Sequence, residues 1–393
     1  MSSTAFGQSS TAAPSPSTPI EKSLARAWSH WESWPTLRES PFQDSSRLYF
    51  SLQVFSEPRS LLVAAGAVSV RNSKFQKQVV VFRDTGSWVS PPLAVADPRL
   101  PKPVSDGCGS IIVFWAAESQ RGDEIWFARL KADQWSAPKR IPSLPRQHWG
   151  ANQNNPIRLP GCRVAVVLVA RDTTTGEYQH RLVVVADSAI AHVRTIASDG
   201  NFSQSDLAQQ GRTLTYAYMR HMPPARFAVT FLRSIDQGET WKRVRDDTLP
   251  PNSIAQSIHM ITVGEELWFG RVEGQDFAAR GERRFVIGPL ARRTNYSTTF
   301  VDDGGFTDYF MTGSACNAPT LVRLTGDLIN RIALFSFDGS MWHEREGPKN
   351  TFGFSVNSRA RLGRSVEGMA VVIDTAGRPP TMKFFRTINT CNR

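Results

Sequence analysis

Four arginines follow apolar, strand-like runs at intervals along the chain, and their side chains could recognise an anion. These residues are Arg71, Arg171, Arg220 and Arg271. A guanidinium group can donate two parallel hydrogen bonds to one carboxylate, so arginines that converge on one point form an oxyanion clamp. Strand ends that meet at one edge of a fold would therefore create an anion site. The alternative is that these arginines pair with nearby acids such as Asp172, Glu273 and Asp276.

The segment from Ser234 to Trp241 has the composition of a tight turn between two strands. It follows the apolar run 227–232 and precedes a Lys-Arg-Val segment. Ser234 and Asp236 can accept hydrogen bonds from the backbone N–H groups of the turn, and Gly238 can adopt a positive φ. Trp241 supplies a large apolar surface for burial. The pattern predicts a hairpin in which these four residues have structural roles.

Similar turns recur at intervals of roughly fifty residues, which is typical of repeat architectures. The tryptophans that end these turns are Trp88, Trp135, Trp241 and Trp342. Two further members should fall near positions 188 and 292, where apolar runs end without a tryptophan. Six units fit this spacing. Four unrelated hairpins in one all-β domain are the alternative.

Composition favours one large β domain. The 393 residues are 40% hydrophobic and include 27 glycines and 25 prolines. These separate short runs rich in β-branched and aromatic residues, which are strand signals. Helical periodicity is nearly absent after residue 45. No apolar run approaches the length of about 18 residues that suggests a transmembrane helix, so we expect no membrane partner.

The four cysteines favour neither a zinc site nor a disulfide framework. Cys108, Cys162, Cys316 and Cys391 show no Cys-x-x-Cys spacing. Cys108 and Cys162 occupy similar places in adjacent repeats, where we expect reduced core thiols rather than a bonded pair. We therefore expect no metal and no cofactor.

The chain carries a formal net charge of +11, and its basic residues are dispersed. Local clusters occur at 280–284 and 292–293. No nucleic-acid-binding motif accompanies them, so we expect no nucleic-acid partner. The excess of arginine favours an anionic ligand, while an ordinary solvated basic surface is the alternative.

The N-terminal residues 1–42 differ from the β domain that we expect over 43–393. Residues 2–19 are rich in Ser, Thr, Ala and Pro, a composition typical of disorder, and Glu21–Trp34 can form a short amphipathic helix. The tail lacks the charged start and apolar core of a secretory signal peptide. We expect a cytoplasmic protein or one exported without such a signal. In composition the tail also resembles the leader of effectors injected by needle-type secretion systems.

The turn motif, written Ser-x-Asp-x-Gly-x-Thr-Trp, closely resembles the Asp-box, or BNR repeat, of sialidase-like proteins. Residues 154–161 resemble the Asn-x-Pro-Ile segment of the same family, and the similarity spans roughly residues 50 to 345. The resemblance implies an all-β, six-bladed β-propeller of sialidase type, which we expect to be a monomer. In such propellers the Asp-box joins the outer strands of a blade, on the side opposite the ligand funnel.

In function, the resemblance implies an exo-glycosidase that hydrolyses terminal sialic-acid-type sugars. That chemistry uses a tyrosine nucleophile activated by a glutamate, an acid/base aspartate and an arginine clamp for the sugar carboxylate. Arg71, Arg171, Arg220 and Arg271 take the substrate-binding role in this scheme. Residues 74–76 read Lys-Phe-Gln where the acid/base aspartate belongs, and 314–319 contain no tyrosine where the nucleophile belongs.

Tyr309 and Glu273 are the remaining candidates for a catalytic role. Three functions therefore stay open. The first is a sialidase-type hydrolase, and the second is a catalytically silent propeller that binds glycan or protein. The third is a fucose-lectin-type propeller, suggested by the tryptophan-containing pairs Phe114-Trp115, Ile125-Trp126 and Gln134-Trp135. The expected ligand is a glycan or another small anion.

Overall fold

The computed structural model describes a chain built from β-strands. The described residues are 31–33, 47–57, 60–71, 74–83, 86–93, 98–119, 122–150, 154–222, 226–263, 265–274, 281–292, 296–302, 307–312, 320–325, 331–337, 342–346, 352–356, 366–374 and 381–388. Side chains are described mainly between residues 76 and 297. Within these ranges no helix is long and apolar enough to cross a membrane. The all-β prediction is confirmed over the described part of the chain.

The strands follow one another in antiparallel hairpins. The first half of the chain contains β1 (Trp31–Ser33), β2 (Arg47–Glu57), β3 (Ser60–Arg71), β4 (Lys74–Arg83), β5 (Gly86–Val89), β6 (Pro98–Ser105), β7 (Ser110–Ser119), β8 (Gly122–Lys131), β9 (Gln134–Trp135), β10 (Lys139–Arg140), β11 (Gln147–Trp149), β12 (Ile157–Leu159), β13 (Arg163–Asp172) and β14 (Tyr178–Ala186). The second half contains β15 (Ala189–Gln210), β16 (Thr213–Met222), β17 (Arg226–Ser234), β18 (Lys242–Thr248), β19 (Ile254–Val263), β20 (Glu266–Gly274), β21 (Gly281–Pro289), β22 (Tyr296–Asp302), β23 (Thr307–Thr312), β24 (Thr320–Thr325), β25 (Arg331–Phe337), β26 (Trp342–Glu346), β27 (Phe352–Val356), β28 (Val366–Asp374) and β29 (Thr381–Ile388).

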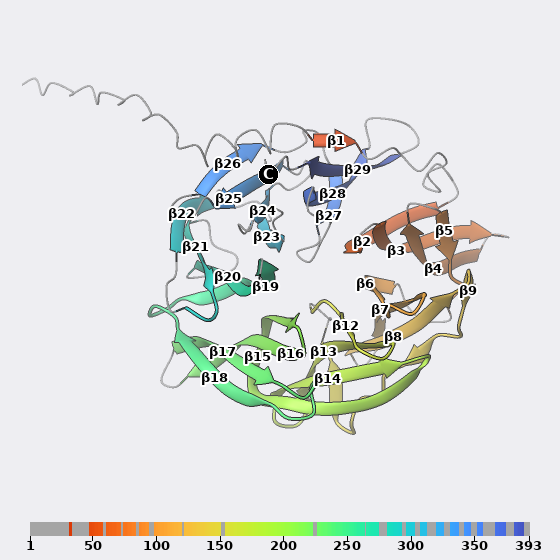
Figure 1. The fold of residues 1–393 in the computed structure, drawn as a ribbon. Coiled ribbons are helices and arrows are strands. Elements are labelled where there is room, and N and C mark those ends of the chain that lie inside the picture. The colour runs from red at the N-terminus through yellow and green to blue at the C-terminus, as the bar shows by residue number, and fades with distance from the viewer. Residues whose placement is uncertain are drawn as a thin grey trace, which may run out of the picture.

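The sheets stand around a common centre in chain order, as the blades of a propeller do (Figure 1). Four sheets are four-stranded: β2–β5, β19–β22, β23–β26, and β27–β29 with β1. The remaining sheet has 13 strands, and we divide it into three successive groups, β6–β10, β12–β15 and β15–β18. These groups are continuous because β11 links β8 to β13, and because the 22-residue β15 pairs with both β14 and β16.

Counted along the chain from β2–β5 as the first, the described strands form seven groups, and β6–β10, β12–β15 and β15–β18 are the second, third and fourth. The prediction of six blades is therefore not confirmed. The additional group is the one that contains the first and the last of the described strands, β1 and β29. Its outer strand is β1, whose Trp31 and Ser33 pair with Thr387 and Phe385 of β29. Because this outer strand comes from the N-terminal segment, no hairpin turn connects it to β29. Counting turn motifs along the sequence therefore misses this group.

The N-terminal segment also differs from its predicted helix. The helix was expected over Glu21–Trp34, but Trp31–Ser33 are a β-strand. The pairing with β29 satisfies backbone groups that a helix would have satisfied internally. The other residues of the expected 1–42 tail lie outside the described residues.

The hydrophobic core lies between neighbouring groups of strands. One layer packs the second group against the third and includes Phe114, Phe127 and Val166. The next layer packs the third group against the fourth and includes Leu182 and Leu214. Central strands such as β13 are buried along seven consecutive residues because both of their faces are covered. This explains why their sequences are continuous apolar runs rather than alternating ones.

The turn between β17 and β18 is stabilised by hydrogen bonds of Ser234 and Asp236, as the sequence predicted, and by one of Trp241. The Gly238 N–H donates to Ser234 Oγ at 2.7 Å, and the Thr240 N–H donates to Asp236 Oδ1 at 2.9 Å. The indole N–H of Trp241 donates to the Gly238 carbonyl at 3.1 Å. Hydrogen bonds from the Thr240 side chain and backbone, and from Ser234, hold the pKa of Asp236 well below its usual range. The turn is therefore stabilised by its own side chains.

Substituting Gly238 with alanine should lower the free energy of unfolding by about 2 kcal/mol. Gly238 has a φ of +98°, and an added Cβ would lie 2.4 Å from Leu182 Cδ2. Urea denaturation measures the change. Gly211→Ala is the matched control, because φ there is +60° and nothing lies within 4 Å of the added Cβ. A Gly238→Ala variant no less stable than the control would contradict the role given to this turn.

Cys108 and Cys162 form a disulfide, which corrects the expectation of reduced core thiols. Cys108 is exposed in the β6–β7 turn, and Cys162 lies in the β12–β13 turn. Their Cα atoms are 5.5 Å apart, across 54 positions of sequence. The bond joins equivalent turns of the second and third groups. Sequence spacing alone could not show this, because the contact exists only once the two groups are side by side.

Candidate functional site

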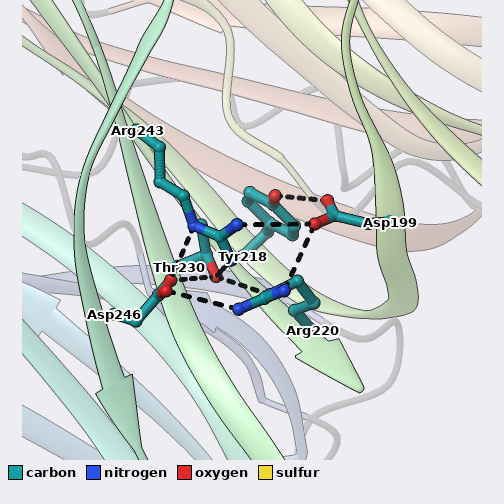
Figure 2. Close-up of polar contacts among 6 residues, drawn as sticks. All are labelled: Asp199, Tyr218, Arg220, Thr230, Arg243 and Asp246. Atoms are coloured by element: carbon teal, nitrogen blue, oxygen red, sulfur yellow. Dashed lines mark hydrogen bonds and ion pairs between the residues drawn. The ribbon is translucent and has the colours of Figure 1, made fainter. Parts of the chain in front are cut away.

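Arg220, near the end of β16, lies at the centre of a polar cluster on the fourth group of strands. Figure 2 shows the six side chains that we call the Arg220 cluster, and they come from β15, β16, β17 and β18. They are Asp199, Tyr218, Arg220, Thr230, Arg243 and Asp246. Tyr218 pairs with Thr230 across β16 and β17, and Thr230 pairs with Asp246 across β17 and β18. Cross-strand pairs lie on the same face of a sheet, which brings these side chains together.

Two aspartates face two arginines in this cluster. Arg220 Nη2 lies 3.3 Å from Asp246 Oδ2, and Arg220 Nη1 lies 3.6 Å from Asp199 Oδ2. Arg243 Nε donates to Asp246 Oδ1 at 3.0 Å, and its Nη1 lies 3.9 Å from Asp199. The Thr230 hydroxyl donates to Asp246 Oδ1 at 2.7 Å. The formal charges of the four ionic groups cancel.

The cluster is only partly covered. The side chain of Arg220 is 17% exposed, whereas that of Asp199 is 47% exposed. Burial raises the pKa of Asp246, but hydrogen bonds from Thr230 and Arg243 outweigh it and hold the pKa below its usual range. Asp246 therefore remains ionised beside the two guanidinium groups. The cluster presents fixed donors and acceptors to solvent.

Tyr218 connects the cluster to a buried aromatic layer. Its hydroxyl donates to Asp199 Oδ1 at 2.6 Å, while its side chain is almost entirely buried. Burial, and then the hydrogen bond to Asp199, raise the pKa of Tyr218 well above its usual value. Its ring stacks on Tyr216, with centroids 5.6 Å apart. The phenol is thus held in its protonated, hydrogen-bond-donating form.

His180 lies beneath both tyrosines. Its Nδ1 is 2.6 Å from the Tyr216 hydroxyl, and its ring centroid is 4.8 Å from that of Tyr218. The side chain is fully buried, and burial lowers the pKa of His180 to about 4, against a smaller opposing effect of Asp199. The imidazole is therefore neutral at physiological pH. His180 and Tyr216 lie in ordinary strand patterns, so sequence reasoning gave no signal for them.

Asn154 belongs to a buried polar row that joins the innermost strands. It accepts a hydrogen bond from Ser205 Oγ at 2.8 Å, and its backbone carbonyl accepts one from Lys102 Nζ at 2.9 Å. Asp206, next along β15, accepts from the Met260 N–H at 2.7 Å. These contacts run from β6 in the second group of strands to β19 in the fifth. Asn154 opens the Asn-x-Pro-Ile segment singled out in the sequence, and its role here is structural.

Arg271 forms a buried ion pair, as the alternative interpretation of the strand-end arginines expected. Its Nη2 lies 2.7 Å from Glu273 Oε1, and its Nη1 lies 3.5 Å from Asp247 Oδ2. The side chains of Arg271 and Glu273 are about 95% buried. Glu273, a candidate catalytic residue, is thus engaged by an arginine in the described structure.

Arg220 and Arg271 do not converge on one point. They contact Asp246 and Asp247, which are consecutive in β18. Consecutive strand residues point to opposite faces of a sheet, so the two arginines lie on opposite faces of the fourth group. The three-dimensional structure therefore does not bring this pair into a shared clamp.

Arg171 is exposed at the end of β13, and its guanidinium lies 5.7 Å from the centre of the Tyr178 ring. Asp172 does not pair with Arg171 but accepts hydrogen bonds from the backbone N–H groups of Thr175 and Thr174, and these bonds lower the pKa of Asp172.

The structure describes the backbones of Arg71 in β3 and Tyr309 in β23, but not their side chains. Their predicted roles stay predictions. The described residues contain no group of three or more potential metal-ligating side chains.

No protein-family model matches this chain, and no curated protein sequence matches it. Among solved structures, the polysaccharide lyase Uly1 superposes with a TM-score of 0.52 at 8% identity, covering 86% of this chain and 90% of that one. A Trypanosoma rangeli sialidase in complex with 2,3-difluorosialic acid gives 0.49 at 11% identity, covering 87% and 58%.

The β-propeller domain of the Trilobed protease from Pyrococcus furiosus gives 0.48 at 10% identity, covering 87% and 93%. At identities this low the likeness concerns the fold alone. The ring of antiparallel sheets in Figure 1 is itself the arrangement of a propeller-like all-β fold.

Proposed function

We propose that this protein is a glycan-recognising propeller whose saccharide site is the Arg220 cluster. The observation that supports the proposal is the partly exposed set of two carboxylates and two guanidinium groups held in place by Thr230 and Tyr218. Ionised groups make the stronger hydrogen bonds in proteins, and a small number of fixed polar groups is what orients a ligand. Sugar hydroxyls and a sugar carboxylate offer complementary donors and acceptors.

Binding without turnover is the function that this geometry supports best. Arg220 is already paired with two carboxylates, so a sugar carboxylate would have to compete with Asp199 and Asp246. The clamp expected of a sialidase needs guanidinium groups that are free to bind substrate. The silent glycan-binding propeller therefore becomes the first candidate.

Hydrolysis of a terminal sialic-acid-type sugar is the second candidate, and one observation favours it. Tyr218 and Asp199 form a tyrosine–carboxylate pair at 2.6 Å, the kind of pair that could generate a tyrosine nucleophile. Burial of Tyr218 and its raised pKa weigh against attack by this phenol. The pair is better suited to hold Asp199 in position.

A glycan array and a fluorogenic sialoside, used in parallel, test the two candidates. We expect Arg220→Ala to weaken array binding by about 10- to 100-fold, because it removes hydrogen bonds between charged groups. Arg194→Ala is the matched control, since Arg194 is an exposed arginine paired with Glu239 in the turn between β17 and β18. Sialoside turnover that Arg220→Ala abolishes would favour the hydrolase. Absence of both binding and turnover in the unmutated protein would refute the glycan proposal.

The disulfide supports the exported alternative for localisation. Disulfides persist in oxidising compartments and are rare in the cytosol. The Cys108–Cys162 bond would therefore form after the chain leaves a reducing environment. Alkylation of the native protein, followed by mass spectrometry, checks this proposal: free thiols at both positions would contradict it.

A further inference from the structure

Arg181 is a buried arginine with no carboxylate partner among the residues that the structure describes. It lies in β14, and only 3% of the residue is exposed. Its Nη2 donates to Gln179 Oε1 at 3.0 Å, and its guanidinium lies 5.9 Å from the centre of the Trp149 ring. Its Nε is buried, and no described residue accepts a hydrogen bond from it. No ion pair to Arg181 occurs among the residues that the structure describes.

Arg271, the other buried arginine discussed above, has the carboxylate partners that the described residues do not supply to Arg181. Both arginines are buried to a similar degree, but Arg271 has Glu273 and Asp247 beside it. A buried charge is costly unless a counter-charge compensates it. Burial lowers the pKa of Arg181, yet an arginine keeps its proton at physiological pH. The Arg181 guanidinium therefore needs an anion.

A second unsatisfied group lies on the same face of the sheet. Gln147 and Trp149 of β11 pair with Asp172 and Ala170 of β13, and Arg181 pairs with Leu168 of the same strand. Because the three β13 residues are spaced by two, their partners share one face, which packs between the second and third groups. Gln147 Oε1 is buried there, and within the described part of the chain no group donates a hydrogen bond to it.

Trp149 packs beside the Arg181 guanidinium and is itself held in a fixed position. Its indole N–H donates to the Ile141 carbonyl at 3.1 Å, and the residue is almost entirely buried. An aromatic face stabilises a guanidinium lying over it but does not neutralise its charge. The arrangement thus holds the arginine in place, while no described carboxylate compensates its charge.

We propose that Arg181 binds one small oxyanion between the second and third groups of strands, at a site separate from the Arg220 cluster. A carboxylate, phosphate or sulfate group would accept hydrogen bonds from Nε and the neighbouring Nη of Arg181. A protonated oxygen or an adjacent hydroxyl of the ligand would donate to Gln147 Oε1. This inference is independent of the proposed glycan function.

Thermal unfolding of the full chain tests the site. Sodium sulfate, phosphate and acetate at millimolar concentrations are compared with sodium chloride at equal ionic strength. We expect the midpoint to rise with oxyanion concentration, because a ligand that binds only the folded state stabilises it. Arg181→Met should lose most of this rise and, without oxyanion, should be at least as stable as the unmutated protein.

The controls separate a bound anion from general salt effects. Arg194→Met removes an exposed arginine and should keep the full oxyanion response. Arg181→Lys keeps the charge but loses the guanidinium fork, so oxyanion affinity should fall at least tenfold. Arg220→Ala should leave the oxyanion response intact even if it abolishes glycan binding.

Two results would overturn the proposal. The first is an oxyanion response equal in Arg181→Met and the unmutated protein. The second is an Arg181→Met variant that is destabilised while no oxyanion shifts the unmutated protein, which would make Arg181 a purely structural residue. Thermal unfolding is also measured with free glucuronate. A midpoint that rises with glucuronate but not with sulfate or phosphate would identify a sugar carboxylate as the ligand.

Discussion

Replacing Cys108 and Cys162 together with serine should lower the free energy of unfolding by roughly 4 kcal/mol. The bond closes a loop across 54 positions of sequence, so its removal gives the unfolded chain many more conformations. It also joins the β6–β7 and β12–β13 turns, which hold the second and third groups together. Urea denaturation of the two proteins, with both transitions fitted to midpoint and slope, measures the difference.

Reduction provides the control for this prediction. Dithiothreitol should destabilise the unmutated protein by a similar amount and should leave the double serine variant unchanged. A difference below about 1 kcal/mol between the two proteins, with the bond verified by mass spectrometry, would mean that the contacts between the groups already restrict the unfolded chain.

Acidification from pH 6.5 to pH 4 should remove about 3 kcal/mol of stability through His180 alone. Burial lowers the pKa of this imidazole from its ordinary value of 6.5 to about 4 in the folded protein. Between these values the unfolded chain binds a proton that the folded chain does not. Stability is therefore full above pH 6.5 and falls as the pH drops toward 4. Denaturation midpoints measured at half-unit intervals of pH check the expected slope.

The groups that face His180 define the controls. Tyr216 and Tyr218 contact the ring, and Asp199 is the charged group that opposes the shift. The tyrosines stay protonated throughout this range, because burial raises both of their pKa values. His180→Phe should flatten the pH dependence between 6.5 and 4, whereas His221→Phe, at an exposed histidine, should not. An unchanged slope in His180→Phe would refute the assignment.

Local features were predictable from the sequence for a physical reason. The turn from Ser234 to Trp241 is stabilised by bonds between residues at most four positions apart, so its composition suffices to predict it. The apolar runs gave the strands in the same way. Arg220 was predicted to bind substrate because it lies at a strand end, and that role stays a prediction. Its partners Asp199 and Asp246 come from other strands and were not predicted.

Features that depend on distant contacts were missed or wrong. The seventh group of strands needs β1, which is more than 350 positions from β29 in the chain. The disulfide needs two turns of different groups to meet. The shared arginine clamp failed for Arg220 and Arg271 because Asp246 and Asp247 direct them to opposite faces of one sheet.

By itself, the sequence determined an all-β chain of hairpins with a repeated turn and several arginines near strand ends, because strand propensity and turn chemistry act between near neighbours. The tertiary structure alone decided how many groups the described strands form and which arginines are paired with carboxylates. It also decided that Arg181 is buried with no counter-charge among the described residues. Burial and ion pairing depend on which strands lie side by side, and the strands that meet are far apart in the chain.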